Sequence, residues 1–213
     1  MRGHASRDQN RRPPPRRGMS LGMQTHRSLP SLLRELLRAL KVAREPKLQG
    51  VIAARGLTHD IPAWGLDFVE FTGLTYRPLL GGDGALIVPV FDEGLMVDLV
   101  ACRISDRHTA THHGIARALG ENWIDRAILD RTPLSLFSDP LRWLMAGRQG
   151  AVVLDWRQAP FLFDGLGEIA CDSPALANRV HAATRRMAQP PKSCLVHQMG
   201  EELCIRASRR RRC

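Results

Sequence analysis

The sequence predicts an α/β protein, with a small mixed sheet flanked by helices and by disordered basic tails. The sheet is expected to contain a β-hairpin over about residues 85–103 and a parallel βαβα unit over about residues 151–188. Two apolar runs enclose Asp92-Glu93-Gly94, which is typical of a hairpin turn. Apolar segments at 151–155 and 168–171 alternate with helical patterns, and this alternation favours parallel strands joined by right-handed crossovers.

Basic charge is concentrated at the two ends of the chain. Residues 1–50 carry 12 Lys and Arg against 3 Asp and Glu, residues 190–213 carry 6 against 2, and residues 51–189 carry 13 against 16. A mildly acidic body with basic arms indicates salt-sensitive, sequence-independent attraction to polyanions. We therefore expect DNA or RNA to associate with the arms, which include Arg209, Arg210, Arg211 and Arg212.

The chain of 213 residues, with 44% apolar content, is long enough to fill one core of ordinary size. We divide it into a disordered arm (1–28), a mixed α/β part (29–136), a βαβα unit (137–189) and a basic tail (190–213). Five cysteines without any Cys-x-x-Cys spacing exclude a zinc ribbon. Free thiols, together with the absence of a signal peptide or an apolar span, predict a cytoplasmic protein without a membrane partner.

Three helices are expected in the first half of the chain. The first begins at Ser28 and ends before Pro46, and its Leu32, Leu33, Leu36, Leu37 and Leu40 fall on one face. We expect this helix to dock on the body, with a protein partner or an anionic membrane surface bound through residues 31–43 as the alternative. Further helices are expected over 58–70 and 109–119, and Pro89 is expected at a strand edge or bulge.

The second half shows a clear alternation of strands and helices. Ser138-Asp139-Pro140 is typical of a helix start, and Gly147 ends that helix. The strands expected at Ala151–Asp155 and Glu168–Cys171 are followed by a helix that opens at Ser173-Pro174. Because ligands bind at the carboxyl ends of parallel strands, Asp155 and Asp172 are the candidate catalytic residues.

Several short motifs occur in a family-like order: Gly56-Leu57-Thr58, Leu74–Pro78, Pro89–Gly94, Val97–Leu99 and Arg103. In this order the chain resembles the RNA-polymerase core of bacterial DnaG-type primases and related phage and plasmid primases, over about residues 51–180. The resemblance implies a primase-like mixed α/β part followed by a toprim-like unit, and an origin in a mobile element. It also implies that the basic residues after the hairpin contact nucleic acid: Arg103, Arg107 and Arg117.

The acidic residues of a working toprim site are largely missing. Val153–Trp156 stands where the family has Glu-Gly, and no Asp-x-Asp occurs in the chain. Paired divalent ions need several converging carboxylates, so we expect a non-catalytic protein without a cofactor or metal. The alternatives are a Mg²⁺-dependent nucleotidyl-transfer or nuclease activity through Asp155 and Asp172, or a protein-interaction module.

Other residue clusters lack part of the pattern that their chemistry requires. His108, His112 and His113 suggest a metal site, but no third ligand accompanies them, so they are expected to be solvated. Trp123, Trp143 and Trp156 are too scattered along the chain to predict a base-stacking platform, and we expect them in the core. Cys171 is expected to be a small core residue.

Overall fold

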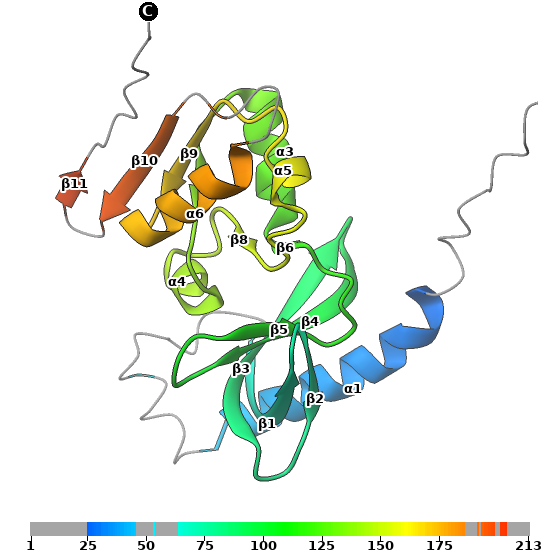
Figure 1. Cartoon of the computed structure of the whole chain (residues 1–213). Helices are drawn as coiled ribbons and strands as arrows, with labels where there is room; N and C mark the ends of the chain where they lie inside the picture. Colours follow the sequence, from blue (N-terminus) through cyan, green and yellow to red (C-terminus); the bar gives the residue numbers. More distant parts are fainter. Residues whose placement is uncertain are drawn as a thin grey trace, which may run out of the picture.

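The structure is a computed structural model that describes residues 25–45, 53, 64–185, 191, 193–198 and 201–203. One lobe consists of helix α1 (Thr25–Ala43) packed against a closed five-stranded barrel (Figure 1). The other lobe contains a four-stranded sheet with its helices. A short ladder of β6 (Ala118–Leu119) and β8 (Val152–Val153) lies between the two lobes (Figure 1).

The barrel has the strand order β1-β2-β5-β4-β3. Its strands are β1 (Gly65–Thr72), β2 (Thr75–Pro78), β3 (Asp83–Asp92), β4 (Leu95–Arg103) and β5 (Thr109–Thr111). β3 and β4 are the predicted hairpin, which is confirmed. The α/β class is confirmed, but the expected small mixed sheet is not formed around the hairpin. Instead β1 pairs with β3 and β2 pairs with β5, and these pairings close the strands into a barrel.

Pro89 lies at a point where β3 has a paired strand on one side only, in agreement with the predicted strand edge or bulge. It pairs with Leu99 on β4, whereas the pairing of β3 with β1 ends at Ile87. The register shifts immediately afterwards, between Val90 and Phe91. The missing backbone donor of proline therefore removes no hydrogen bond from the β1 side of the strand.

Two of the predicted helices are wrong. Residues 65–70 of the expected helix over 58–70 belong to strand β1, and residues 58–63 lie outside the described part. The expected helix over 109–119 is replaced by β5, a turn and β6. Gly114 in that turn has a φ of 72°, a left-handed conformation that interrupts a helix. In both segments strand pairing overrides the helical periodicity of the apolar residues.

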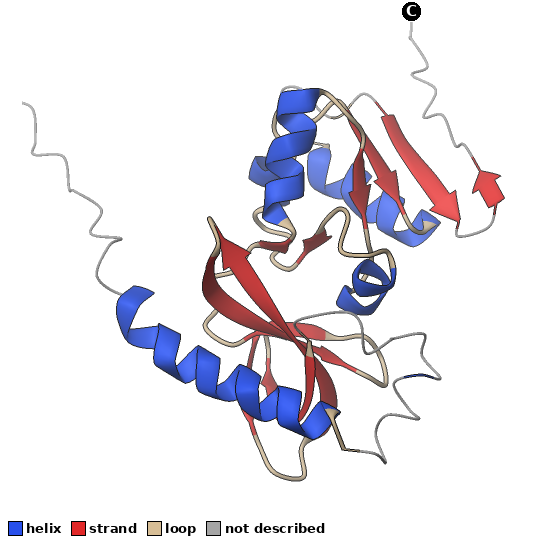
Figure 2. Cartoon of the chain, turned by 180° about the vertical axis from the view of Figure 1, so that it is seen from behind, coloured by secondary structure: helices blue, strands red, loops and turns tan. Residues whose placement is uncertain are grey.

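The second lobe is built on a sheet with the order β11-β10-β9-β7. Its strands are β7 (Leu134–Leu136), β9 (Glu168–Cys171), β10 (Ser193–Gln198) and β11 (Glu201–Leu203). Its helices are α3 (Glu121–Asp130), α4 (Pro140–Met145), α5 (Ala159–Leu162) and α6 (Pro174–Thr184) (Figure 2). β7, β9 and β10 run parallel, and β11 is antiparallel to β10.

The strand expected at Ala151–Asp155 is not the neighbour of β9. Within it, β8 pairs antiparallel with β6, and Ala151 forms a single parallel bridge with Leu136 of β7. β7 therefore lies between Ala151 and β9, and the parallel unit begins at β7. The predicted strand at 168–171 and the helix after Ser173 are confirmed.

Buried apolar residues form one cluster in each lobe and a third between the lobes. The third cluster joins Val88 and Val100 of the barrel to Leu141, Trp143 and Leu144 of α4. The predicted helix at the start of the chain is confirmed as α1, but only part of its leucine face is buried. Leu32 and Leu36 are buried, whereas Leu33 and Leu37 are exposed. Among the described residues, each helix is too short or too polar to cross a membrane.

Candidate functional site

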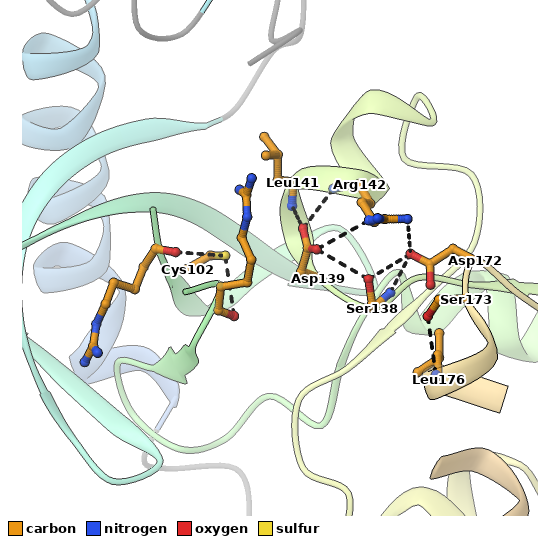
Figure 3. A network of polar contacts seen from close by, with 10 residues as sticks. Cys102, Ser138, Asp139, Leu141, Arg142, Asp172, Ser173 and Leu176 are labelled. Carbon is orange, nitrogen blue, oxygen red and sulfur yellow. Dashed lines mark hydrogen bonds and ion pairs between the residues drawn. The ribbon is translucent and has the colours of Figure 1, made fainter. Parts of the chain in front are cut away.

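The carboxyl ends of β7 and β9 meet at one edge of the parallel sheet. Ser138 and Asp139 follow β7, and Asp172 and Ser173 follow β9. Their polar groups converge with Arg142 of α4 into one network (Figure 3). Ligands of open parallel sheets bind at this edge, so the network is the candidate functional site.

Asp139 is largely committed to the start of helix α4. Its Oδ1 accepts hydrogen bonds from the backbone N–H groups of Leu141 and Arg142, both at 3.0 Å. Its Oδ2 lies 3.4 Å from the Ser138 hydroxyl and 3.8 Å from the Arg142 Nε. The side chain is buried, and Pro140 occupies the first helical turn, where it leaves no N–H unpaired.

Asp172 is held by the residue that follows the neighbouring strand. Its Oδ2 accepts from both the backbone N–H and the hydroxyl of Ser138, each at 2.9 Å, and lies 3.6 Å from the Arg142 Nη1. Its Oδ1 is buried without a hydrogen-bond partner in the described part of the chain. Helix α6 is capped by Ser173, whose hydroxyl accepts from the Leu176 N–H, and not by Asp172.

The site thus holds two carboxylates around one guanidinium and one hydroxyl. Arg142 contributes the positive charge that a cation would supply between Asp139 and Asp172. In the part of the chain that the structure describes, no three His, Cys, Asp or Glu side chains gather as a metal site. A divalent ion could bind here only by displacing the arginine and recruiting further oxygen ligands.

Asp155 lies outside this network. Its Oδ1 accepts from the Arg157 Nε at 2.8 Å, and its Oδ2 accepts from the Arg157 Nη2 at 2.9 Å. The hydrogen bond from the Arg157 side chain is the largest cause that lowers the pKa of Asp155 below its usual value. The segment that leads to Asp155 starts at Ala151, on the other side of β7 from β9, and the strand before Asp155 pairs with β6 rather than with β9. The structure therefore does not bring the two predicted catalytic acids together.

Sequence reasoning missed Ser138, Asp139 and Arg142 as members of the site. Ser138-Asp139-Pro140 was interpreted only as a helix start, which the capping by Asp139 confirms. The signal that could have identified the site is the apolar segment Leu134–Phe137 that directly precedes this cap. A buried strand followed by polar residues and a helix is the pattern of a strand end in a parallel sheet.

The arginines predicted to bind nucleic acid differ in the ion pairs that their side chains form. Arg103 forms ion pairs with Asp83 and Asp106, both at 3.1 Å, and its guanidinium lies 4.5 Å from the centre of the Phe71 ring. Arg117 forms an ion pair with Glu121. The side chain of Arg107 forms no ion pair within the described residues. Arg209, Arg210, Arg211 and Arg212 lie outside the described residues.

The three histidines flank strand β5 rather than lying on a helix: His108 precedes the strand, and His112 and His113 follow it. His112 Nε2 lies 3.5 Å from the Oε2 of Glu35, a buried residue of α1. The His112 ring packs against Tyr76 and His113, with ring centres 5.3 Å and 4.5 Å away. Burial, followed by the charge of His112, lowers the pKa of His113. These contacts connect α1 to the barrel.

Three cysteines lie in the described residues, and all are buried free thiols: Cys102, Cys171 and Cys194. Burial, followed by the charge of Asp139, raises the pKa of Cys102 on β4 to about 12. Its Sγ contacts the carbonyl oxygens of Arg103 and Arg107, both at 3.9 Å (Figure 3). The Sγ atoms of Cys171 and Cys194, on the adjacent strands β9 and β10, are 3.3 Å apart. Cys171 is a core residue, as predicted.

The fold is similar to a primase of known structure. The crystal structure of the Aquifex aeolicus primase, comprising zinc-binding and RNA polymerase domains, matches this chain with a TM-score of 0.54 and 12% sequence identity. The match covers 82% of this chain and 55% of the primase chain, so the chain spans about half the length of that protein. At this identity the likeness shows a primase-like fold and nothing further. No protein-family model and no curated protein sequence matches the chain.

Proposed function

We propose that this protein is a non-catalytic, primase-like protein that associates with nucleic acid. The observation that supports this proposal is the network at the strand ends, where Arg142 and Ser138 hold Asp139 and Asp172. Two-metal phosphoryl transfer requires carboxylates that are free to clamp two divalent ions. Here one carboxylate caps a helix and both lie beside an internal cation.

Nucleic-acid association is proposed from the charge distribution and from the primase-like fold. The excess of basic residues in 1–50 and 190–213 provides a sequence-independent attraction to phosphate. Arg107, on the turn after the hairpin and next to Cys102, adds a basic group on the body. We retain an origin in a mobile element as a prediction of the resemblance.

Metal titration of the full chain tests the non-catalytic part of the proposal. We expect no saturable Mg²⁺ or Mn²⁺ binding by calorimetry, and no nucleotide incorporation or strand cleavage on a single-stranded template. Saturable metal binding with turnover that Asp172→Asn abolishes would contradict the proposal. If Asp155→Asn abolishes it as well, the result would support the alternative enzyme that uses both acids. Asp130→Asn, an exposed acid in a surface ion pair, is the matched control.

Binding of a labelled single-stranded oligonucleotide, followed by fluorescence anisotropy, tests the nucleic-acid part. We expect affinity to fall steeply with salt concentration, because phosphate contacts release counterions. Absence of binding at low salt would overturn this part of the proposal without affecting the metal result.

A protein-interaction role is the second candidate, and the exposed face of α1 favours it. Leu29, Leu33 and Leu37 are spaced four residues apart and are 39%, 48% and 57% exposed. Such a stripe on one helix face is typical of helix-in-groove contacts. Sedimentation of the full chain over a range of concentrations tests whether a second copy covers the stripe. Self-association that Leu33→Glu abolishes would support this role, and a monomer at all concentrations would exclude the second copy.

A further inference from the structure

A cavity of about 560 Å³ lies between the distal part of hairpin β3–β4 and the second lobe. The hairpin contributes Phe91, α3 contributes Trp123, and the loop after α4 contributes Arg148 and Gln149. This loop leads into Ala151, the first residue of the parallel bridge to β7, so the cavity lies at the amino ends of the strands. The strand-end network of Asp139 and Asp172 is at the opposite edge of the sheet. The cavity is therefore separate from the candidate site described above.

Three aromatic side chains line this cavity, although two of them were expected to be scattered in the core. Trp123 is half-buried, Trp143 is buried and Phe91 is 45% exposed. The Trp143 Nε1 donates to the Gly150 carbonyl at 2.8 Å, which fixes its ring. Folding thus brings together aromatic side chains that are far apart in the sequence. Rigid aromatic faces of this kind stack on nucleobases without regard to sequence.

Polar and cationic groups accompany the aromatic rings. The Arg126 guanidinium lies 5.4 Å from the centre of the Trp123 ring, and that of Arg148 lies 5.3 Å from the centre of the Trp143 ring. The exposed side-chain amides of Asn122 and Gln149 form no hydrogen bond within the described residues. Each side-chain amide offers two N–H donors and a carbonyl acceptor. Stacking surfaces, amides and guanidinium groups together are the chemistry that recognises a base and its phosphate.

The size of the cavity suits such a ligand. Cavities of about 300–1,000 Å³ hold small organic ligands. A second cavity of about 310 Å³ adjoins the first, because both are lined by Trp123 and Gln149. Its lining includes Arg126, which is paired with Asp130 at 3.2 Å. A strand that places one base in the first cavity could continue along the second.

We propose that this cavity binds a nucleobase, stacked on Trp123, with Asn122 and Gln149 contacting its edge. The inference rests on the proposed association with nucleic acid and adds a site on the folded body to the basic arms. A single-stranded nucleic acid or a free nucleotide could supply the base, and the two adjoining cavities favour a strand.

Titration of the full chain with a labelled oligodeoxyadenylate at low and at high salt tests the proposal. High salt weakens the phosphate contacts of the arms, whereas stacking persists. We expect Trp123→Ala to weaken binding at high salt about tenfold, an effect of the size seen for loss of one stacked base. Asn122→Ala and Gln149→Ala, at exposed positions, are expected to weaken it without affecting the fold. Phe161→Ala, at an exposed aromatic outside the cavity, is the matched control.

The outcomes separate this inference from the proposed function. Absence of binding at every salt concentration would overturn both. Binding at low salt that disappears at high salt would overturn the cavity alone. Binding at high salt that Trp123→Ala, Asn122→Ala and Gln149→Ala all leave unchanged would overturn it as well. Adenosine monophosphate provides the second arm of the experiment: saturable binding in calorimetry that Trp123→Phe retains and Trp123→Ala removes would identify a free nucleotide as a ligand of the same site.

Discussion

Asp98 is a completely buried carboxylate on β4 that organises the connection between the two lobes. Its Oδ1 accepts from the N–H groups of Leu99 and His113, at 2.8 and 2.9 Å. Its Oδ2 accepts from those of Ile115 and Ala116, at 2.9 and 3.1 Å. One side chain therefore satisfies four backbone donors, three of them in the turn between β5 and β6.

We predict that Asp98→Asn lowers the free energy of unfolding by about 3 kcal/mol, the size of lost hydrogen bonds to a buried charge. The amide nitrogen of asparagine would face N–H donors that only an acceptor can satisfy. Urea unfolding followed by circular dichroism measures the change. Asp130→Asn removes an exposed acid and is expected to cost less than about 1 kcal/mol. Equal effects of the two substitutions would contradict the role of Asp98.

Cys102 makes stability depend on pH in the alkaline range. Burial, followed by the charge of Asp139, raises the pKa of its thiol in the folded protein from 9.0 to about 12. Below pH 9 the thiol is protonated in both the folded and the unfolded protein, so its ionisation does not lower the free energy of unfolding. As pH rises from 9 towards 12, the unfolded thiol ionises first, so the folded state loses stability.

We therefore predict that the urea midpoint of the wild-type chain falls between about pH 8 and about pH 10.5. Cys102→Ala should show a shallower fall, because it removes one of the groups whose pKa is raised by burial. Tyr76, whose pKa burial also raises, accounts for part of the remaining slope. Identical slopes in the two proteins would contradict the assignment to Cys102.

The candidate site was partly predictable at the scale of single residues. Asp172 was identified because it follows a continuous apolar strand, and this strand lies in the parallel sheet as expected. The strand that precedes Asp155 does not pair with β9, and this could not be predicted because strand order within a sheet is not encoded in local periodicity. Leu136 pairs with both Cys171 and Ala151, and only this pairing shows that β7 lies between Ala151 and β9.

At the scale of elements, α1 lies directly against β1 because Gly65 has no side chain. A Cβ atom at Gly65 would come within 2.5 Å of the Ala39 carbonyl carbon and 2.6 Å of the Ala39 Cβ. The same two elements are joined by an ion pair between Arg38 and Asp67 at 2.5 Å. Close backbone approach is a common reason for glycine inside a strand.

We predict that Gly65→Ala separates α1 from the barrel and lowers the free energy of unfolding by about 1–3 kcal/mol, the usual cost of overpacking. Hydrogen exchange should rise in α1 before it rises in β4. Gly84→Ala is the matched control, since a Cβ there meets only Ile104 Cδ1, at 3.9 Å. If the amides of α1 exchange at the same rate in Gly84→Ala and in Gly65→Ala, the close approach at Gly65 is not what holds α1 against the barrel.

Elements with strong local signals were predicted, and elements defined by distant pairing were not. The β3–β4 hairpin has its own turn, and α4 and α6 have the capping residues Asp139 and Ser173. β1 has an apolar spacing that also suits a helix, and its pairing with β3 decides its structure. The closing contact of the barrel, a single parallel pair between Thr75 and Thr111, leaves no local signal.

At the scale of the whole molecule, the apolar cluster between the lobes predicts that they unfold together. Val88 and Val100 of the barrel pack in the same buried cluster as Leu144, which is 1% exposed. Leu144→Ala should cost about 2–5 kcal/mol, as for other buried leucines. Because the cluster is shared, hydrogen exchange by global unfolding should accelerate equally in β3–β4 and in β9–α6. Met145→Ala, at a position 42% exposed on the same helix, is the control and should change exchange little in either lobe. Faster exchange confined to β9–α6 would show that the barrel and α1 unfold independently of the parallel sheet.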